Sequence, residues 1–208
     1  MSFFIAYRKS LLLGGDFMRR VDLTLVLEEN PVIAAIKGKN DLDLAIDSNS
    51  PIVFILNSDI MEYTYIVEKI LKANKYPFIH LDMLTGLASN PIVVDFIHEK
   101  FNGKCGVITT KNNIAEAAVQ RDLRVVQRLF VIDSLSIEMN IKNIKKVNPD
   151  LVEVMPGVIP KAISKIKTEI PNINVIGGGL IETKNEVYEC LKAGGIAVST
   201  TKKELWNS

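Results

Sequence analysis

Residues 175–201 read VIGGGLIETKNEVYECLKAGGIAVSTT, and this stretch governs the predicted fold. An apolar strand ends in glycines 177–179, an amphipathic segment runs from Glu182 to Ala193, and a short strand, Ile196–Val198, leads into hydroxyl residues 199–201. Glycines at the end of a strand let backbone N–H groups approach a ligand closely. In a (β/α)₈ barrel, a phosphate often binds at the loops after strands seven and eight. The stretch therefore predicts a phosphate site, provided that six βα units precede it.

Short apolar runs alternate with segments of helical periodicity before this stretch, which is typical of parallel βαβ units. With the two strands above, the count reaches eight. Eight units favour an α/β fold of the (β/α)₈, TIM-like barrel type over the alternative, a doubly wound sheet. The other expected strands are Val32–Ile36, Ile52–Leu56, Pro77–Leu81, Gly106–Ile108, Val125–Val131 and Leu151–Met155. The other expected helices are Leu42–Ile46, Tyr63–Ala73, Ile92–Phe101, Ile114–Arg121, Leu135–Val147, Val158–Ile170 and Lys202–Trp206.

The composition indicates a single compact domain in a reducing compartment. The chain has 208 residues, 48% of them hydrophobic, and a net charge of +1, so no electrostatic excess points to nucleic acid. Cys105 and Cys190 form no metal-binding pattern, and we expect a cytoplasmic protein without metal or cofactor. Because no segment reaches the roughly 18 apolar residues of a membrane span, no membrane partner is expected.

Two regions of the chain are expected, an N-terminal extension of residues 1–30 and a barrel domain of residues 31–208. The first 17 residues carry apolar patches interrupted by Arg8 and Lys9, without a long apolar core or a clear cleavage site. Met18 could serve as a downstream translation start. Residues 1–17 are therefore expected to lie outside the fold.

Polar residues follow the predicted strands, where barrels of this type carry their binding groups. The candidate ligand-binding residues are Asp82, Lys111, Arg128, Glu153, Gly178, Gly179, Thr200 and Thr201. Asp82 could instead hold a turn, and Lys111 could be a solvated loop lysine. Asp59 and Asp133 precede helices and read as N-caps, for which aspartate is a preferred residue.

Arg128 and Glu153 lie inside apolar runs, VVQRLFV and LVEVM, where a charge is costly unless it is paired or used. Their strands are neighbours in a barrel, so we expect an interior ion pair that either supports a site or is purely structural. Side-chain alternation leaves open whether Gln127 or Arg128 points inward. His80 and His98 are interpreted as a core or a helix-surface histidine, and they give no metal signature.

Six segments in order resemble the glycerol-uptake operon antiterminator regulatory family, the glycerol-3-phosphate-responsive antiterminators. The resemblance spans roughly residues 31–206 and depends above all on VEVMPG, GGGLIET and AVSTTKKELW. The six segments are His80–Asn90, Gly106–Asn113, Gln127–Ser134, Asp150–Lys161, Ile176–Thr183 and Ala193–Trp206. The resemblance implies a barrel-like fold, glycerol-3-phosphate as effector, and action on leader mRNA that prevents premature termination of transcription.

Under this resemblance, glycines 178–179 and threonines 200–201 would bind the phosphate of glycerol-3-phosphate. Asp82, Glu153 and Arg128 would bond the glycerol hydroxyls or hold the groups that do. The expected function is that of a regulator rather than an enzyme. The alternatives are an enzyme that acts on a small phosphorylated metabolite and a sensor that acts through a protein partner; self-association into a homo-oligomer is left open.

A surface for leader mRNA would need lysines or arginines on one face, because phosphate contacts dominate RNA affinity. Two predicted helices carry such residues at i,i+4 spacing. Neighbouring helices could merge them into one stripe, although an ordinary solvated surface would look the same. The candidates are Lys142, Lys145, Lys146, Lys161, Lys165 and Lys167.

Overall fold

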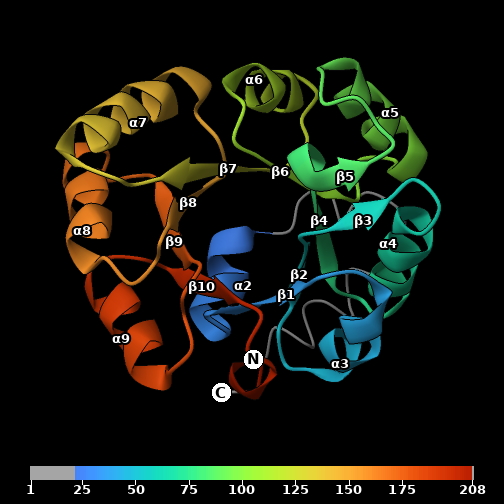
Figure 1. Cartoon of the computed structure of the whole chain (residues 1–208), viewed down its shortest axis with the longest axis horizontal. Helices are drawn as coiled ribbons and strands as arrows, with labels where there is room; N and C mark the ends of the chain where they lie inside the picture. The colour runs from blue at the N-terminus through green and yellow to red at the C-terminus, as the bar shows by residue number, and fades with distance from the viewer. Residues whose placement is uncertain (1–21, 208) are drawn as a thin grey trace.

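Eight parallel strands close into a barrel, which confirms the predicted (β/α)₈ fold (Figure 1). The structure is a computed structural model, and it describes residues 22–207. The first and last barrel strands pair with each other and complete the ring. In order around the barrel, the strands are β1 (Val32–Ile36), β2 (Ile52–Ile55), β4 (Tyr76–His80), β6 (Gly106–Thr109), β7 (Val125–Phe130), β8 (Leu151–Met155), β9 (Asn174–Gly178) and β10 (Ala197–Thr200).

A ring of helices surrounds the strands, as Figure 1 shows. Their ends agree with the predicted ends to within two residues. Asp133 caps its helix by accepting the backbone N–H of Ser136 at 2.8 Å, as predicted. The helices are α3 (Leu42–Asp47), α4 (Tyr63–Lys72), α5 (Ile92–Phe101), α6 (Asn112–Gln120), α7 (Ser134–Val147), α8 (Pro160–Glu169) and α9 (Lys184–Lys192), followed by the short 3₁₀ helix η4 (Lys203–Leu205).

Both faces of the barrel strands are buried, which explains why the strands read as apolar runs. Along β2, for example, Phe54 packs into the barrel interior while Val53 belongs to the layer between strands and helices. At the carboxyl ends of the strands the interior changes character, because His80, Arg128, Glu153 and Ser199 replace the apolar side chains there. The polar layer therefore lies where barrel proteins bind their ligands.

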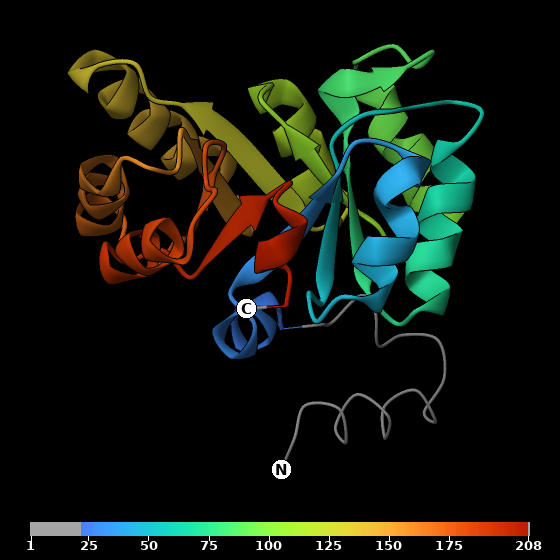
Figure 2. The same ribbon diagram turned by 60° about the horizontal axis from the view of Figure 1, so that its bottom comes forward.

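A helix that was not predicted closes the opposite end of the barrel. Helix α2 (Leu23–Glu29) lies below the strands in Figure 2, drawn in blue. Leu23, Val26 and Leu27 are buried in the same apolar cluster as the barrel interior. Helix α2 precedes residue 31, so the domain division at that point stays a prediction. The expectations for residues 1–17 concern a part of the chain outside the described residues.

The loops after β2 and β4 form a further feature that was not predicted. Strands β3 (Ser58–Asp59) and β5 (Leu84–Thr85) pair in parallel above the barrel. Asp59 stabilises the turn that leads to α4 by accepting the backbone N–H groups of Met61 and Glu62. The short 3₁₀ helix η3 (Leu81–Met83) belongs to the loop after β4, and a second one, η2 (Lys39–Asp41), lies in the loop after β1. Among residues 22–207, no helix combines the length and apolarity required to cross a bilayer.

Candidate functional site

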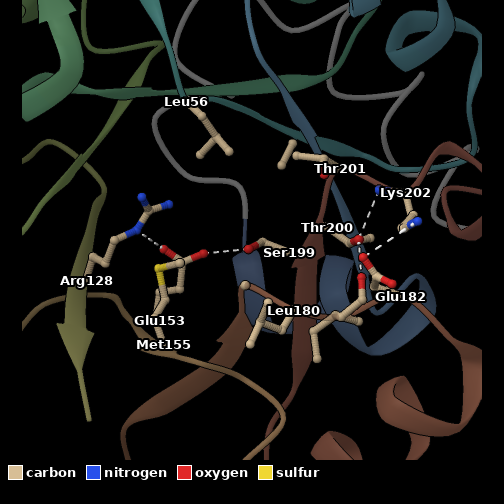
Figure 3. A pocket seen from close by; sticks show the side chains of 13 residues that line it. Leu56, Arg128, Glu153, Met155, Leu180, Glu182, Ser199, Thr200, Thr201 and Lys202 are labelled. Carbon is tan, nitrogen blue, oxygen red and sulfur yellow. Dashed lines mark hydrogen bonds and ion pairs between the residues drawn. The ribbon is translucent and has the colours of Figure 1, made fainter. Parts of the chain in front are cut away.

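A pocket of about 250 Å³ opens at the carboxyl ends of the strands, beside β7, β8, β9 and β10 (Figure 3). Five of the predicted ligand-binding residues line it: Arg128, Glu153, Gly179, Thr200 and Thr201. The pocket also contains Ser199, Glu182 and Lys202, together with the apolar side chains of Leu56, Met155 and Leu180. The structure thus brings together residues from the charged strands and from the glycine-rich loop, and their role in ligand binding stays a prediction.

Arg128 and Glu153 form the expected interior ion pair. They are partners in the β7–β8 ladder, and Arg128 Nε lies 2.5 Å from Glu153 Oε2. Both side chains are buried, with 7% of Arg128 and none of Glu153 exposed. Gln127 points the other way and donates from Nε2 to Asn112 Oδ1 at 2.7 Å. The alternation that the sequence left open is thereby decided in favour of Arg128.

Ser199 completes a chain of three polar side chains across the pocket floor. Its hydroxyl donates to Glu153 Oε1 at 2.5 Å, so each oxygen of this carboxylate has one protein partner. Gly178 lies beside the carboxylate, and a Cβ at this position would collide with Glu153 Oε1. Gly178 does not line the pocket. Its absent side chain provides the space that the Glu153 carboxylate occupies.

The two loops that were predicted to bind phosphate are fastened to each other. Thr200 Oγ1 donates to the carbonyl of Ile181 at 2.6 Å and accepts the backbone N–H of Lys202 at 3.0 Å. The indole N–H of Trp206 donates to the carbonyl of Thr200 at 2.9 Å. Thr200 therefore holds the loops in place with its hydroxyl, whereas Thr201 is exposed at the pocket.

Backbone conformation explains the glycine at the start of the first loop. Gly179 has a φ of +71°, a region that side chains with a Cβ rarely adopt. A Cβ there would also lie 2.8 Å from Met155 Cε, inside the pocket wall. Glycine at this position thus permits the turn and keeps the wall in place.

Lys202 is one of the pocket residues that the sequence prediction missed. Its ammonium lies 3.6 Å from Glu182 Oε1, and the two residues lie on the side of the pocket away from Arg128 and Glu153 (Figure 3). The signal was present in the sequence, because a lysine follows the threonine pair at the end of a strand that was already assigned to phosphate binding. The N-terminal region of α9 is capped by other residues, Thr183 and Glu186.

Besides Gly178, two predicted site residues lie outside this pocket. Asp82 accepts hydrogen bonds from Ser89, Thr109 and Thr110, including the backbone N–H of Thr110 at 2.6 Å. Burial alone would raise the pKa of Asp82, but these hydrogen bonds outweigh it and hold the pKa below its ordinary value. This geometry favours the alternative in which Asp82 holds a turn. Lys111 is exposed at the N-cap position of α6, as a solvated loop lysine would be.

His80 belongs to the polar layer but is not part of the pocket lining. It is buried, and its Nδ1 has no hydrogen-bond partner among the described residues. Burial, followed by the positive charge of Arg128, lowers the pKa of His80 to about 4. The imidazole is therefore neutral at physiological pH, which suits a position next to a guanidinium.

The chain is similar to proteins of one family. A family model described as "Glycerol-3-phosphate responsive antiterminator" matches residues 32–206. "Uncharacterized protein YgcP" from Escherichia coli (strain K12) is 35% identical over 181 residues, which make up 87% of this chain and 94% of that protein. The crystal structure of the glycerol uptake operon antiterminator regulatory protein from Listeria monocytogenes matches with a TM-score of 0.79 at 31% identity, over 85% of this chain and 95% of that one. A glycerol uptake operon antiterminator-related protein from Thermotoga maritima matches with a TM-score of 0.75 at 30% identity, over 84% and 96% of the respective chains.

Enzymes also share the architecture at much lower identity. Two aldolases match with TM-scores of 0.65 and 0.63 at 10% and 11% identity. A likeness of this kind establishes the barrel fold alone, because one fold hosts many unrelated functions.

Proposed function

This chain belongs to the glycerol-3-phosphate responsive antiterminator family, and from that premise we propose that it binds glycerol-3-phosphate and acts on leader mRNA as a transcription antiterminator. The observation that supports the ligand assignment is a pocket lined by Arg128, Glu153 and Ser199 on one side and by Gly179, Thr201 and Lys202 on the other. Its volume of about 250 Å³ lies just below the roughly 300–1,000 Å³ of drug-sized sites, which suits a small metabolite.

The rim of the pocket offers the groups that a phosphate requires. Gly179, Thr201 and Lys202 line it, and these residues carry backbone N–H groups, a hydroxyl and a positive charge. A lysine ammonium binds phosphate as a point charge and needs no fixed orientation. The phosphate of glycerol-3-phosphate is therefore assigned to the loops after β9 and β10.

The floor of the pocket suits the glycerol hydroxyls. Each carboxylate oxygen of Glu153 can accept more than one hydrogen bond, so the partners Arg128 and Ser199 leave acceptor capacity for a ligand hydroxyl. Arg128 uses Nε for Glu153, and its guanidinium carries four further N–H groups. Donors and acceptors thus lie side by side, as a diol requires.

The regulatory assignment is favoured over the alternative, an enzyme of a phosphorylated metabolite. A Schiff-base lysine is activated by desolvation or by a neighbouring cation. Lys202, the lysine that lines the pocket, is 45% exposed and faces a carboxylate. This environment supports a role in binding rather than in covalent catalysis.

Leader mRNA is assigned to the outer surface of α7 and α8, which contact each other. Lys142, Lys145, Lys161 and Lys165 are exposed there. The two remaining candidates already have partners, since Lys146 pairs with Glu116 and Lys167 donates to the carbonyls of residues 171 and 173. The proposed RNA surface is therefore the basic stripe of these four exposed lysines, and it is expected to act in the cytoplasm.

Titration calorimetry with glycerol-3-phosphate tests the ligand, and filter binding to leader mRNA with and without it tests the regulation. Thr201→Val should weaken ligand binding, whereas Thr168→Val on the outer surface of α8 should leave it unchanged. The ligand should tighten RNA binding, because an effector acts only through its different affinity for two states. Absence of glycerol-3-phosphate binding would exclude the assigned effector, and conversion of glycerol-3-phosphate to a product would favour the enzyme.

A further inference from the structure

Glu182 and Lys202 form an ion pair at the edge of the pocket, with 3.6 Å between Glu182 Oε1 and Lys202 Nζ (Figure 3). Glu182 belongs to the loop after β9, and Lys202 belongs to the loop after β10. We infer that the Glu182 carboxylate competes with the phosphate of a ligand for the Lys202 ammonium. In the absence of a ligand Glu182 pairs with Lys202, and a bound phosphate replaces it. This inference rests on the proposed function, since it requires a phosphorylated ligand in this pocket.

The backbone of the rim is fixed, so the exchange needs only side-chain rotation. The hydrogen bond from Thr200 Oγ1 to the Ile181 carbonyl joins the two loops directly beside Glu182 and Lys202. The side chains of the pair are 61% and 45% exposed, respectively, which leaves both of them room to turn. A ligand can therefore separate the pair without moving either loop.

The start of α9 does not depend on the Glu182 side chain. The Glu186 carboxylate accepts the backbone N–H groups of Glu182 and Thr183 at 2.7 and 2.9 Å, and the Thr183 hydroxyl accepts that of Glu186. This reciprocal cap satisfies the helix terminus. The Glu182 carboxylate is thus available to pair with Lys202, and its replacement by an amide leaves the cap intact.

The relative strengths of the two pairs favour displacement by phosphate. An exposed carboxylate–ammonium pair gains little, because both groups are well solvated in the alternative state. A phosphate dianion carries more charge and three strong acceptor oxygens, so its bonds to an ammonium are the stronger ones. A neutral polyol offers Lys202 no charge in exchange. Competition by Glu182 would therefore lower the affinity for phosphorylated ligands only moderately. A neutral polyol would not displace Glu182 from Lys202.

A double-mutant cycle with calorimetry tests the competitor. Glu182→Gln should tighten glycerol-3-phosphate binding about two- to fivefold, the range by which an exposed ion pair competes. Lys202→Gln should weaken binding, and the gain from Glu182→Gln should disappear in the Lys202→Gln background. Glu204→Gln on η4 is the matched control: it removes the same charge from an exposed neighbour outside the pocket lining, and it should leave the affinity unchanged.

Parallel titrations with inorganic phosphate separate the failure of this inference from the failure of the proposed function. If glycerol-3-phosphate binds Glu182→Gln with the same affinity as the parent, the competitor role of Glu182 is wrong and the effector assignment stands. If Glu182→Gln raises the affinity equally in the Lys202→Gln background, the competitor role is also wrong. That result would mean that Glu182 repels the ligand phosphate directly and does not act through Lys202. If inorganic phosphate shows the coupled gain but glycerol-3-phosphate binds no better than phosphate, the competitor stands and the effector assignment fails. Binding of neither ligand overturns both.

Discussion

Arg128 and Glu153 are register partners on adjacent barrel strands, and their side chains form an ion pair inside the barrel. The pair stands at the level where the apolar interior gives way to the pocket. Below it, Val126 and Leu151 belong to the interior apolar cluster. Above it lies the space assigned to the ligand. The ion pair is therefore both the floor of the site and the upper limit of the core.

Removal of one partner of this pair should be costly. Arg128→Met leaves the Glu153 carboxylate buried without its counter-ion, and a loss of about 3–5 kcal/mol of unfolding free energy is expected. Arg121→Met is a matched control, because Arg121 pairs with Asp95 at the same 2.5 Å but is 58% exposed. Its loss should stay below about 1 kcal/mol. Urea denaturation measures both values, and equal losses would contradict the burial assigned to Arg128.

A side chain at position 179 should damage the phosphate rim. Gly179→Val introduces a β-branched residue at positive φ and presses on Met155. Affinity for glycerol-3-phosphate should fall by at least about tenfold, equivalent to about 1.4 kcal/mol. Gly194→Val provides the control, since Gly194 also has a positive φ, +98°, but lies outside the pocket lining. Circular dichroism checks that both variants fold, and calorimetry should show a loss for Gly179→Val alone.

Reversal of charge on the basic stripe should abolish RNA binding. Lys142→Glu combined with Lys165→Glu changes α7 and α8 together, and phosphate contacts depend directly on such charges. The control is Lys69→Glu with Lys72→Glu on α4, which lies across the barrel in Figure 1. Filter binding at one salt concentration should distinguish the two double variants, while both retain glycerol-3-phosphate. Equal RNA affinity of both would remove the stripe as the RNA surface.

His80 should make the protein less stable as the pH falls below neutrality. Its native pKa of about 4 lies below the ordinary value of 6.5, so the unfolded chain takes up a proton in this range before the native one does. Stability contributed by neutral His80 is therefore lost as the pH falls from about 6.5 towards 4. The shift predicts a loss of about 2 kcal/mol between pH 7 and pH 5. Denaturation of the parent and of His80→Phe at both pH values measures the difference, and parallel pH dependences would refute the assignment.

Helix α2 should contribute to the stability of the barrel. Leu27 is fully buried in the interior cluster, and a buried leucine replaced by alanine costs about 2–5 kcal/mol. Leu25 lies on the same helix with 55% of its surface exposed, so Leu25→Ala should cost far less. Thermal or urea unfolding of the two variants tests whether the barrel domain includes residues before position 31. Similar small losses would support the predicted division at residue 30.

Local pattern was sufficient to predict the barrel but not its closures. Each strand of the barrel is buried on both faces and therefore forms a continuous apolar run, which the sequence shows without knowledge of the neighbouring strands. Helix α2 is only seven residues long and lies before the first strand, where nothing local shows that the open barrel end needs a cover. Strands β3 and β5 have two residues each, too few for a periodic signal. These elements depend on tertiary contacts, which a single sequence does not display.

The same distinction applies to the site. Arg128 and Glu153 were predicted because a charge within an apolar run is visible in the sequence itself. Asp82 was selected for its place at a strand end, yet its role depends on Thr109 and Thr110, which approach it from a neighbouring strand and loop. Thr200 was selected for its hydroxyl, and that hydroxyl is already bonded to Ile181. Residue type identified the candidates, whereas the partners decide which of them face the pocket.

Gly178 and Glu153 are in close contact, since a Cβ on Gly178 would collide with the Glu153 carboxylate. Evolutionary change at either position is therefore conditional on the other. A lineage that gains alanine at position 178 would have to shorten or withdraw the acid at position 153, and with it lose the hydrogen bond from Ser199. Among relatives of this chain, the two positions should change together, and the order of substitution should begin with the acid.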